Sequence, residues 1–363
     1  MRQFTNISME ALAKLMGIRL EGRKAVIRKN TDSCAPHFLS TQIKLFLLLN
    51  FHANSNTGLT PLLSCCELAS NIRCHKKTIY SSLEMLSKHD MIEYSESIEK
   101  GFIDVRVLHL SDMYKRRGEN GKGYITFNMD LLQALLSAKD INILRVILTS
   151  LMETITKNTL SASKSLKEVR IPFDTLSAAF PSSTRPRDIR TACNEEGLFG
   201  NLFERTSDDL KKTIFVKLKE DFDGKYIKQK IKLEARKNIF SEIESINNAV
   251  RDANTGIHED GFIHISDALA FRDHDIDLFN TVDILHPERS LPLLELNSDI
   301  RNDCATIAQD FGIDTVITAL RTFYSNYLLS DSFKQDKSKS LGGLIRRIVG
   351  ELFGQPELLT NPS

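Results

Sequence analysis

The feature that most constrains the fold is residues 68–92, where two short helical patterns follow each other across a tight turn. A small residue, Ala69, stands where two such helices would touch. In the second pattern, Ile79, Leu83 and Leu86 recur at helical spacing on one face. The spacing predicts a second helix that is anchored to the first along one apolar stripe.

Two segments with strand periodicity follow, Met91 to Ser95 and Phe102 to Leu110, with Lys100 and Gly101 near the bend between them. Alternating apolar and polar residues over such lengths indicate a β-hairpin. A strongly apolar helix is expected before the whole pattern, from Leu39 to Phe51. The predicted order is therefore a long helix, two short helices and a hairpin.

Residues 39–110 resemble the winged helix-turn-helix domains of bacterial regulators and of plasmid replication initiators. The resemblance covers the long helix, the helix-turn-helix and the hairpin, or wing, and it implies double-stranded DNA as the partner. In helix-turn-helix proteins the N-terminal end of the second helix enters the major groove. The sequence departs from the family at Arg73, where the turn often has glycine. The residues expected to contact DNA in this unit are His75, Lys76, Lys77, Thr78, Tyr80, Ser81 and, in the wing, Lys100.

The same order recurs over residues 168–218. Thr175 to Phe180 is predicted as a short helix capped by Asp174, and Arg185 to Glu196 as the second helix capped by Thr184. Arginine bonds guanine bidentately or clamps phosphates. The residues expected to face DNA near the start of this second helix are Arg185, Arg187 and Arg190. A charged, solvated helical face would give the same pattern, and both readings stay open. The tandem layout resembles that of plasmid replication initiators.

The second hairpin is predicted from Leu202 to Thr206 and from Thr213 to Leu218. Its expected tip carries the acidic pair Asp208 and Asp209, which is unsuited to a phosphate contact. The wing of this unit is therefore a poorer candidate for DNA contact than its helix.

The overall fold class predicted is mainly α with small β-hairpin wings, an α+β chain. Its expected parts are an N-terminal arm with a short helix from Ser8 to Met16 (1–37), a first winged helix (38–118), a second winged helix (119–224) and an acidic helical domain (225–363). The arm also contains a basic stretch, Arg19 to Lys29.

The net charge of +1 conceals a division along the chain. Met1 to Lys232 contain 36 Lys and Arg against 26 Asp and Glu, a net of +10, whereas Leu233 to Ser363 contain 12 against 21, a net of −9. Such asymmetry is typical of a polyanion-binding part joined to an acidic part, although charge also drifts along chains that bind no nucleic acid.

The acidic part begins with a predicted long helix, Tyr226 to Asn254, that has an apolar stripe. The stripe consists of Ile227, Ile231, Ile239, Ile243, Ile246 and Val250. It either mediates dimerisation or packs on the rest of its own domain. Because helix-turn-helix proteins often bind palindromes as dimers, we expect a homodimer. Docking of host replication proteins and an intramolecular mask over the basic part are the other roles open to this region.

The sequence offers no pattern for catalysis, a cofactor or a metal, so we expect a protein that is not an enzyme. Its six cysteines form no spaced framework, and Cys65, Cys66 and Cys74 with His75 do not match zinc-ligand spacing. Free thiols in a cytoplasmic protein without membrane contact are expected.

Three functional hypotheses follow. The first is an initiator of replication for a plasmid or mobile element, favoured by the tandem layout. The second is a dimeric transcriptional regulator. The third is an interaction scaffold whose winged helices never touch DNA.

Overall fold

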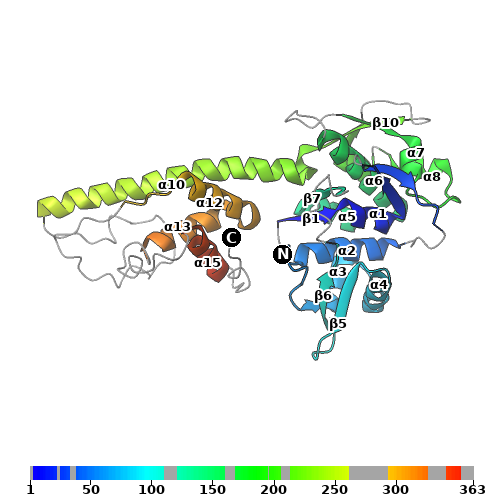
Figure 1. Ribbon diagram of the computed structural model, residues 1–363, viewed down its shortest axis with the longest axis horizontal. Coiled ribbons are helices and arrows are strands. Elements are labelled where there is room, and N and C mark those ends of the chain that lie inside the picture. The colour runs from blue at the N-terminus through cyan, green and yellow to red at the C-terminus, as the bar shows by residue number, and fades with distance from the viewer. Residues whose placement is uncertain are drawn as a thin grey trace. The chain divides into compact units, whose positions relative to one another are not determined.

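The computed structural model describes the residues 3–22, 25–32, 38–109, 121–159, 168–194, 196–205, 213–260, 293–325 and 341–352. The chain divides into two compact units, Met1–Ile227 (unit 1) and Lys228–Ser363 (unit 2) (Figure 1). Helices predominate, and the sheets of the described residues are small, antiparallel and two- or three-stranded. The mainly helical α+β character predicted from the sequence is confirmed.

The first half of unit 1 contains a strand and a helix, a small hairpin, and then a module of helix, strand, two helices and hairpin. Its elements are β1 (Phe4–Ser8), α1 (Met9–Met16), β2 (Ile18–Glu21), β3 (Val26–Lys29), α2 (Ser40–His52), β4 (Leu63–Ser64), α3 (Cys65–Ile72), α4 (Lys76–Lys88), β5 (Ile92–Glu96) and β6 (Phe102–Val107). We call residues 40–107 module A. Helix α1 lies where the sequence predicted it, because the Ser8 hydroxyl accepts a hydrogen bond from the Ala11 N–H (3.0 Å) and left-handed Gly17 ends the helix.

The second half of unit 1 repeats this order, without the small hairpin and with one further helix. Its elements are β7 (Tyr124–Asn128), α5 (Met129–Ser137), α6 (Ile141–Thr159), β8 (Val169–Pro172), α7 (Phe173–Ser177), α8 (Pro186–Ala192), α9 (Leu198–Leu202), β9 (Phe203–Arg205) and β10 (Thr213–Leu218). We call residues 141–218 module B.

Modules A and B share one pattern of strand pairing. The sheet order is β4-β6-β5 in module A and β8-β10-β9 in module B, and every pair is antiparallel. In each module the strand before the two short helices thus pairs with the last strand of the hairpin. The common order and pairing indicate two copies of one structural plan.

The elements that precede the modules are exchanged between the two halves: α1 packs on α6 and α5 packs on α2. Strands β1 and β7 pair antiparallel, with Ser8 opposite Tyr124 and Asn6 opposite Thr126. Ser8 caps α1 and Asn128 caps α5, so counting back from the two caps makes Thr126 the counterpart of Asn6. The two strands are therefore paired symmetrically, because equivalent residues of the two halves lie opposite each other at Asn6 and Thr126. At this central pair the Thr126 hydroxyl donates a hydrogen bond to Asn6 Oδ1 (2.8 Å).

The described part of residues 1–37, expected as a separate arm, is built into unit 1. Ile7, Leu12, Leu15 and Ile27 are buried in the same apolar core as modules A and B. The boundaries expected after residues 37 and 118 thus separate elements that pack together.

In module A the residues expected to join the two short helices are buried as predicted. Ala69 is buried where α3 meets α4, and Ile79, Leu83 and Leu86 are at most 1% exposed. Arg73 adopts the left-handed conformation (φ 60°, ψ 53°) that glycine adopts most readily. The turn therefore forms without glycine.

In module B two predicted helix starts are wrong. Helix α7 begins at Phe173, so Asp174 lies in its first turn and does not cap it. Helix α8 begins at Pro186 because proline is preorganised for the first helical position, which makes Arg185 the cap in place of Thr184. The helix ends at Ala192, short of the expected Glu196. A turn follows, in which the Asn194 N–H donates a hydrogen bond to the Thr191 carbonyl (3.1 Å).

Unit 2 is helical wherever the structure assigns regular elements. Its helices are α10 (Gly224–Asp260), which starts at the end of unit 1, α12 (Ser298–Phe311), α13 (Ile313–Phe323) and α15 (Leu341–Leu352). From the predicted stripe of α10, Ile239, Ile243, Ile246 and Val250 are buried in one core with α12, α13 and α15. These four residues of the stripe thus pack within unit 2. No helix in the described parts of the chain is long and apolar enough to cross a membrane.

Candidate nucleic-acid interface

The start of α4 presents a polar, basic surface. His75 caps the helix through its backbone carbonyl, which accepts from the Thr78 N–H (2.8 Å). His75, Lys76, Lys77 and Ser81 are exposed, and Thr78 is half-buried. Their common position at one helix end follows from the apolar stripe behind them, which holds the opposite face of α4 against the core.

Tyr80 is placed differently from this expectation. Its ring is half-buried against the core, and its hydroxyl hydrogen-bonds to the thiol of Cys65 at the start of α3. That hydrogen bond, together with burial, raises the pKa of Tyr80 to about 12. Tyr80 therefore ties α4 to α3, and its hydroxyl is engaged within the protein.

The β5–β6 hairpin of module A lies against the start of α4. A Cβ added to Gly101 would come within 2.6 Å of Lys76 Nζ, so the Lys76 ammonium sits beside the hairpin turn. Lys100 is exposed in that turn, as predicted, but Glu96 and Glu99 are exposed near it. The hairpin tip thus carries more negative than positive charge, whereas Lys76 and Lys77 are exposed at the start of the helix beside it.

Module B presents arginines at the start of α8. Arg185 and Arg187 are exposed, whereas Arg190 is half-buried with its guanidinium 5.3 Å from the centre of the Phe173 ring. Ile189 and Cys193 are buried, as the sequence predicted, and burial raises the pKa of the Cys193 thiol to about 12. Two of the three predicted arginines therefore face solvent freely. The expected wing tip with Asp208 and Asp209 lies outside the described residues.

Two cations of unit 1 are buried and add nothing to a surface. Lys44 of α2 donates to the carbonyl oxygen of Ala138 (2.5 Å), and its pKa is lowered by burial and by the charge of Arg73. Arg145 of α6 lies 6.0 Å from the centre of the Phe180 ring, and burial lowers its pKa. Both join helices inside unit 1.

Helices α4 and α8 both lie along the right-hand edge of unit 1 in Figure 1, with β5 at the bottom and β10 at the top. This is the disposition that the exchange of the two halves produces. Comparison of the chain with protein-family models, curated proteins and solved structures gives no match. In the part of the chain that the structure describes, no three His, Cys, Asp or Glu side chains gather as metal ligands would.

Proposed function

We propose that modules A and B are winged helices through which the chain binds double-stranded DNA, as the replication initiator of a plasmid or mobile element. The observation that carries the proposal is the repeated order of helix, strand, two helices and hairpin, with the same strand pairing in both modules. The second short helix of such a domain enters the major groove.

The residues at the starts of α4 and α8 fit this role. Lys76, Lys77, Arg185 and Arg187 are all exposed there. Lysine and arginine bond phosphates, which position the protein, and arginine also reads guanine in the major groove. Binding should therefore be strong at low salt and weaken steeply as salt rises.

The choice of an initiator rests on the tandem arrangement. Two modules in one unit give a single chain two DNA-contacting helices, suited to a repeat of about twenty base pairs, or about two helical turns. The alternative is a dimeric regulator. Burial of Ile239, Ile243, Ile246 and Val250 in unit 2 means that this part of the α10 stripe gives no support for a dimer. A homodimer and docking of host replication proteins on acidic unit 2 remain predictions.

The binding test replaces the four exposed cations at the two helix starts with alanine. Because these side chains are exposed, we expect the fold to persist and duplex binding in a gel shift to fall by at least roughly a hundredfold. The substituted residues are Lys76, Lys77, Arg185 and Arg187. Unchanged affinity would place the contact surface elsewhere.

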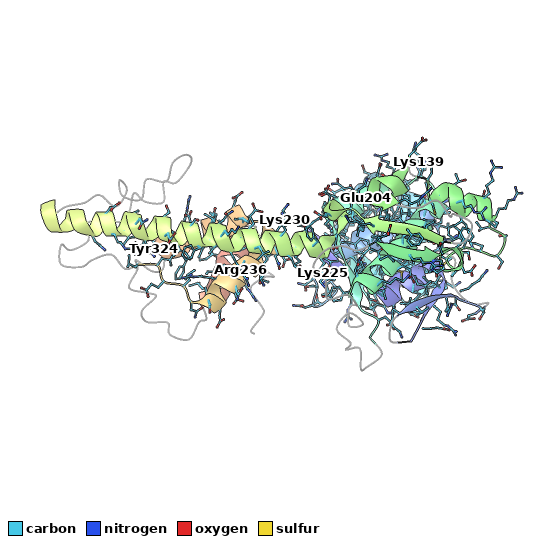
Figure 2. The ribbon with its side chains drawn as sticks, turned by 90° about the horizontal axis from the view of Figure 1, so that it is seen from above. Lys139, Glu204, Lys225, Lys230, Arg236 and Tyr324 are labelled. Carbon is cyan, nitrogen blue, oxygen red and sulfur yellow. The ribbon has the colours of Figure 1, made fainter. Side chains whose placement is uncertain are left out.

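A matched control replaces four exposed cations, all of them lysines, that lie away from the two helix starts. Its residues are Lys88, Lys139, Lys230 and Lys237, all exposed, of which Lys139 and Lys230 are labelled in Figure 2. We expect the fold-reduction in duplex affinity of this control to be less than about a fifth of that of the first variant. Wild-type protein that binds no duplex at low salt would support the scaffold hypothesis instead.

Replication is tested separately from binding. The gene and its flanking DNA are placed on a marker plasmid that lacks an origin, and retention of the marker is followed in a host. We expect retention with the wild-type and control chains and loss with the four-alanine chain. Specific DNA binding that changes transcription without supporting retention would identify a regulator.

A further inference from the structure

The basic stretch from Arg19 to Lys29 has no role in the interface described so far. It contains five Lys and Arg and one acidic residue, Glu21, so it holds a large share of the excess positive charge of the first 232 residues. The structure describes β2 and β3 of this stretch, which pair as an antiparallel hairpin. A hairpin this basic requires a structural or a binding explanation.

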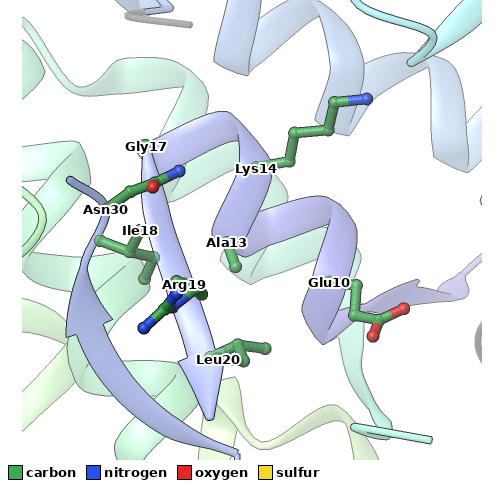
Figure 3. Close-up of a pocket in the computed structure, with 8 residues that line it drawn as sticks. All are labelled: Glu10, Ala13, Lys14, Gly17, Ile18, Arg19, Leu20 and Asn30. Atoms are coloured by element: carbon green, nitrogen blue, oxygen red, sulfur yellow. The ribbon is translucent and has the colours of Figure 1, made fainter. Parts of the chain in front are cut away.

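The hairpin has one apolar and one charged face. Ile18 and Ile27 are buried and Leu20 is partly buried, and they fix the hairpin to the core of unit 1. Figure 3 shows the sharp turn at Gly17 from which β2 runs back along α1. On the opposite face Arg19 and Arg28 are paired across the strands, and their side chains are 63% and 62% exposed.

The hairpin lies beside the helix-turn-helix of module B. Strand β3 packs against α7. Lys29 Nζ donates to the hydroxyl of Ser182 (2.9 Å), which belongs to the turn between α7 and α8. The basic hairpin is therefore fixed next to the helix that carries Arg185 and Arg187, although it is distant from that helix in sequence.

A cleft of about 460 Å³ separates β3 from this turn. Its lining includes Arg28, Lys29, Thr175, Ser182 and Thr184, with Asp174 as its one acidic residue. Arginine, lysine and hydroxyl side chains are the groups that bond DNA phosphates. The cleft thus places the Lys29 ammonium and several hydroxyls at the edge of a candidate DNA-reading helix.

We propose that the β2–β3 hairpin and this cleft form a clamp for the DNA sugar–phosphate backbone that extends the interface of module B. The inference rests on the proposed function, because it assumes that α8 faces duplex DNA. Phosphates bind Arg19 and Arg28 on the outer face and Lys29 in the cleft. The hairpin supplies to module B the backbone contacts for which the acidic pair Asp208 and Asp209 is unsuited.

Glu21 offers a test of the clamp in which a substitution is expected to strengthen DNA binding. In the free protein Glu21 forms ion pairs with both Arg19 and Arg28, the latter at 3.6 Å. Exposed ion pairs of this kind are weak, so a phosphate displaces the carboxylate at little cost. Removal of the Glu21 charge should therefore strengthen DNA binding, an effect that damage to the fold would not produce.

The experiment measures the affinity of the full chain for a random-sequence duplex over a range of salt concentrations. For the variant Arg19→Ala/Arg28→Ala we expect the slope of log affinity against log salt to fall by about 2, and the affinity near 0.1 M salt to fall at least roughly tenfold. For Glu21→Gln we expect roughly two- to fivefold tighter binding. The control Lys230→Ala/Lys237→Ala loses the same charge in unit 2 and should keep the wild-type slope.

The outcomes separate this inference from the proposed function. Binding by wild type, with Arg19→Ala/Arg28→Ala matching the control, would overturn the clamp and leave the proposed function intact. Looser or unchanged binding by Glu21→Gln would also overturn it. Absence of duplex binding by wild type would overturn the proposed function itself. Reduced binding by the arginine variant together with tighter binding by Glu21→Gln would establish the clamp.

Discussion

Arg73 ends α3 in a conformation that arginine adopts only at a cost. Its φ of 60° and ψ of 53° are left-handed, and the Cys74 N–H donates to the Ala69 carbonyl (3.0 Å) to close the turn. Glycine has no Cβ and avoids this cost. We therefore expect Arg73→Gly to raise the free energy of unfolding by about 0.5–1 kcal/mol, measured as a higher urea midpoint with an unchanged slope.

A second variant separates backbone strain from charge at this position. The charge of Arg73 contributes to lowering the pKa of buried Lys44, so its removal relieves some repulsion. Arg73→Gln removes the charge and retains the left-handed strain. A gain from Arg73→Gln as large as that from Arg73→Gly would contradict the strain argument.

Individual side chains at the candidate interface could be predicted to different degrees. Helical periodicity correctly set Ile79 and Leu83 inward and left Lys76 and Lys77 exposed, because this depends only on the spacing along one helix. It could not reveal the hydrogen bond between the Tyr80 hydroxyl and the Cys65 thiol, since Cys65 belongs to another helix. The cation–π contact of Arg190 with Phe173 was missed for the same reason.

At the scale of elements, the long apolar helices and the hairpin strands of both modules were predictable, whereas β1, β2, β3 and β7 were not. Strand β1 has five residues, and its partner β7 lies more than a hundred residues further along the chain. No local pattern signals such a pairing, because strand propensity depends on context. The hairpin of β2 and β3 was visible only as a basic stretch, since strands this short give a weak alternation.

Gly224, the first residue of α10, packs closely against the backbone of β7, and this close approach requires that it has no side chain. A Cβ on Gly224 would overlap the carbonyl oxygen of Thr126, which the β1–β7 pairing holds in place. We expect Gly224→Ala to lower the free energy of unfolding of unit 1 by about 2 kcal/mol, measured by chemical denaturation.

Gly197 provides the matched control for this substitution. A Cβ there would lie 3.6 Å from the nearest heavy atom, the carbonyl oxygen of Asn194, which is an ordinary contact. Gly197→Ala should therefore change stability by less than about 1 kcal/mol. Equal effects of the two substitutions would show that α10 does not start against β7 as described.

At the scale of the whole molecule, the repeated plan explains why the sequence suggested separate domains where the structure has one unit. The pattern of each module is local and can be recognised along the chain. The packing between halves is not local, because α1 covers α6 and α5 covers α2. A boundary drawn at residue 118 therefore cuts through a shared core.

This exchange predicts how fragments of the chain behave. A fragment of residues 38–118 lacks α5, so the apolar surface of α2 that α5 covers would face water. Buried Lys44 would also lose its acceptor, the Ala138 carbonyl. We expect this fragment to show no cooperative thermal transition by circular dichroism, whereas residues 1–227 should melt cooperatively.

A third fragment provides the control. Residues 1–140 keep α5 but lack α6, so α1 loses the helix on which it packs. If halves exchange elements as described, this fragment should also fail to melt cooperatively, although it contains all of module A. Mixing it with residues 141–227 should restore a cooperative transition, since the pair supplies every element of unit 1. Independent cooperative folding of residues 38–118 would contradict the exchanged packing and support the domain boundaries expected from the sequence.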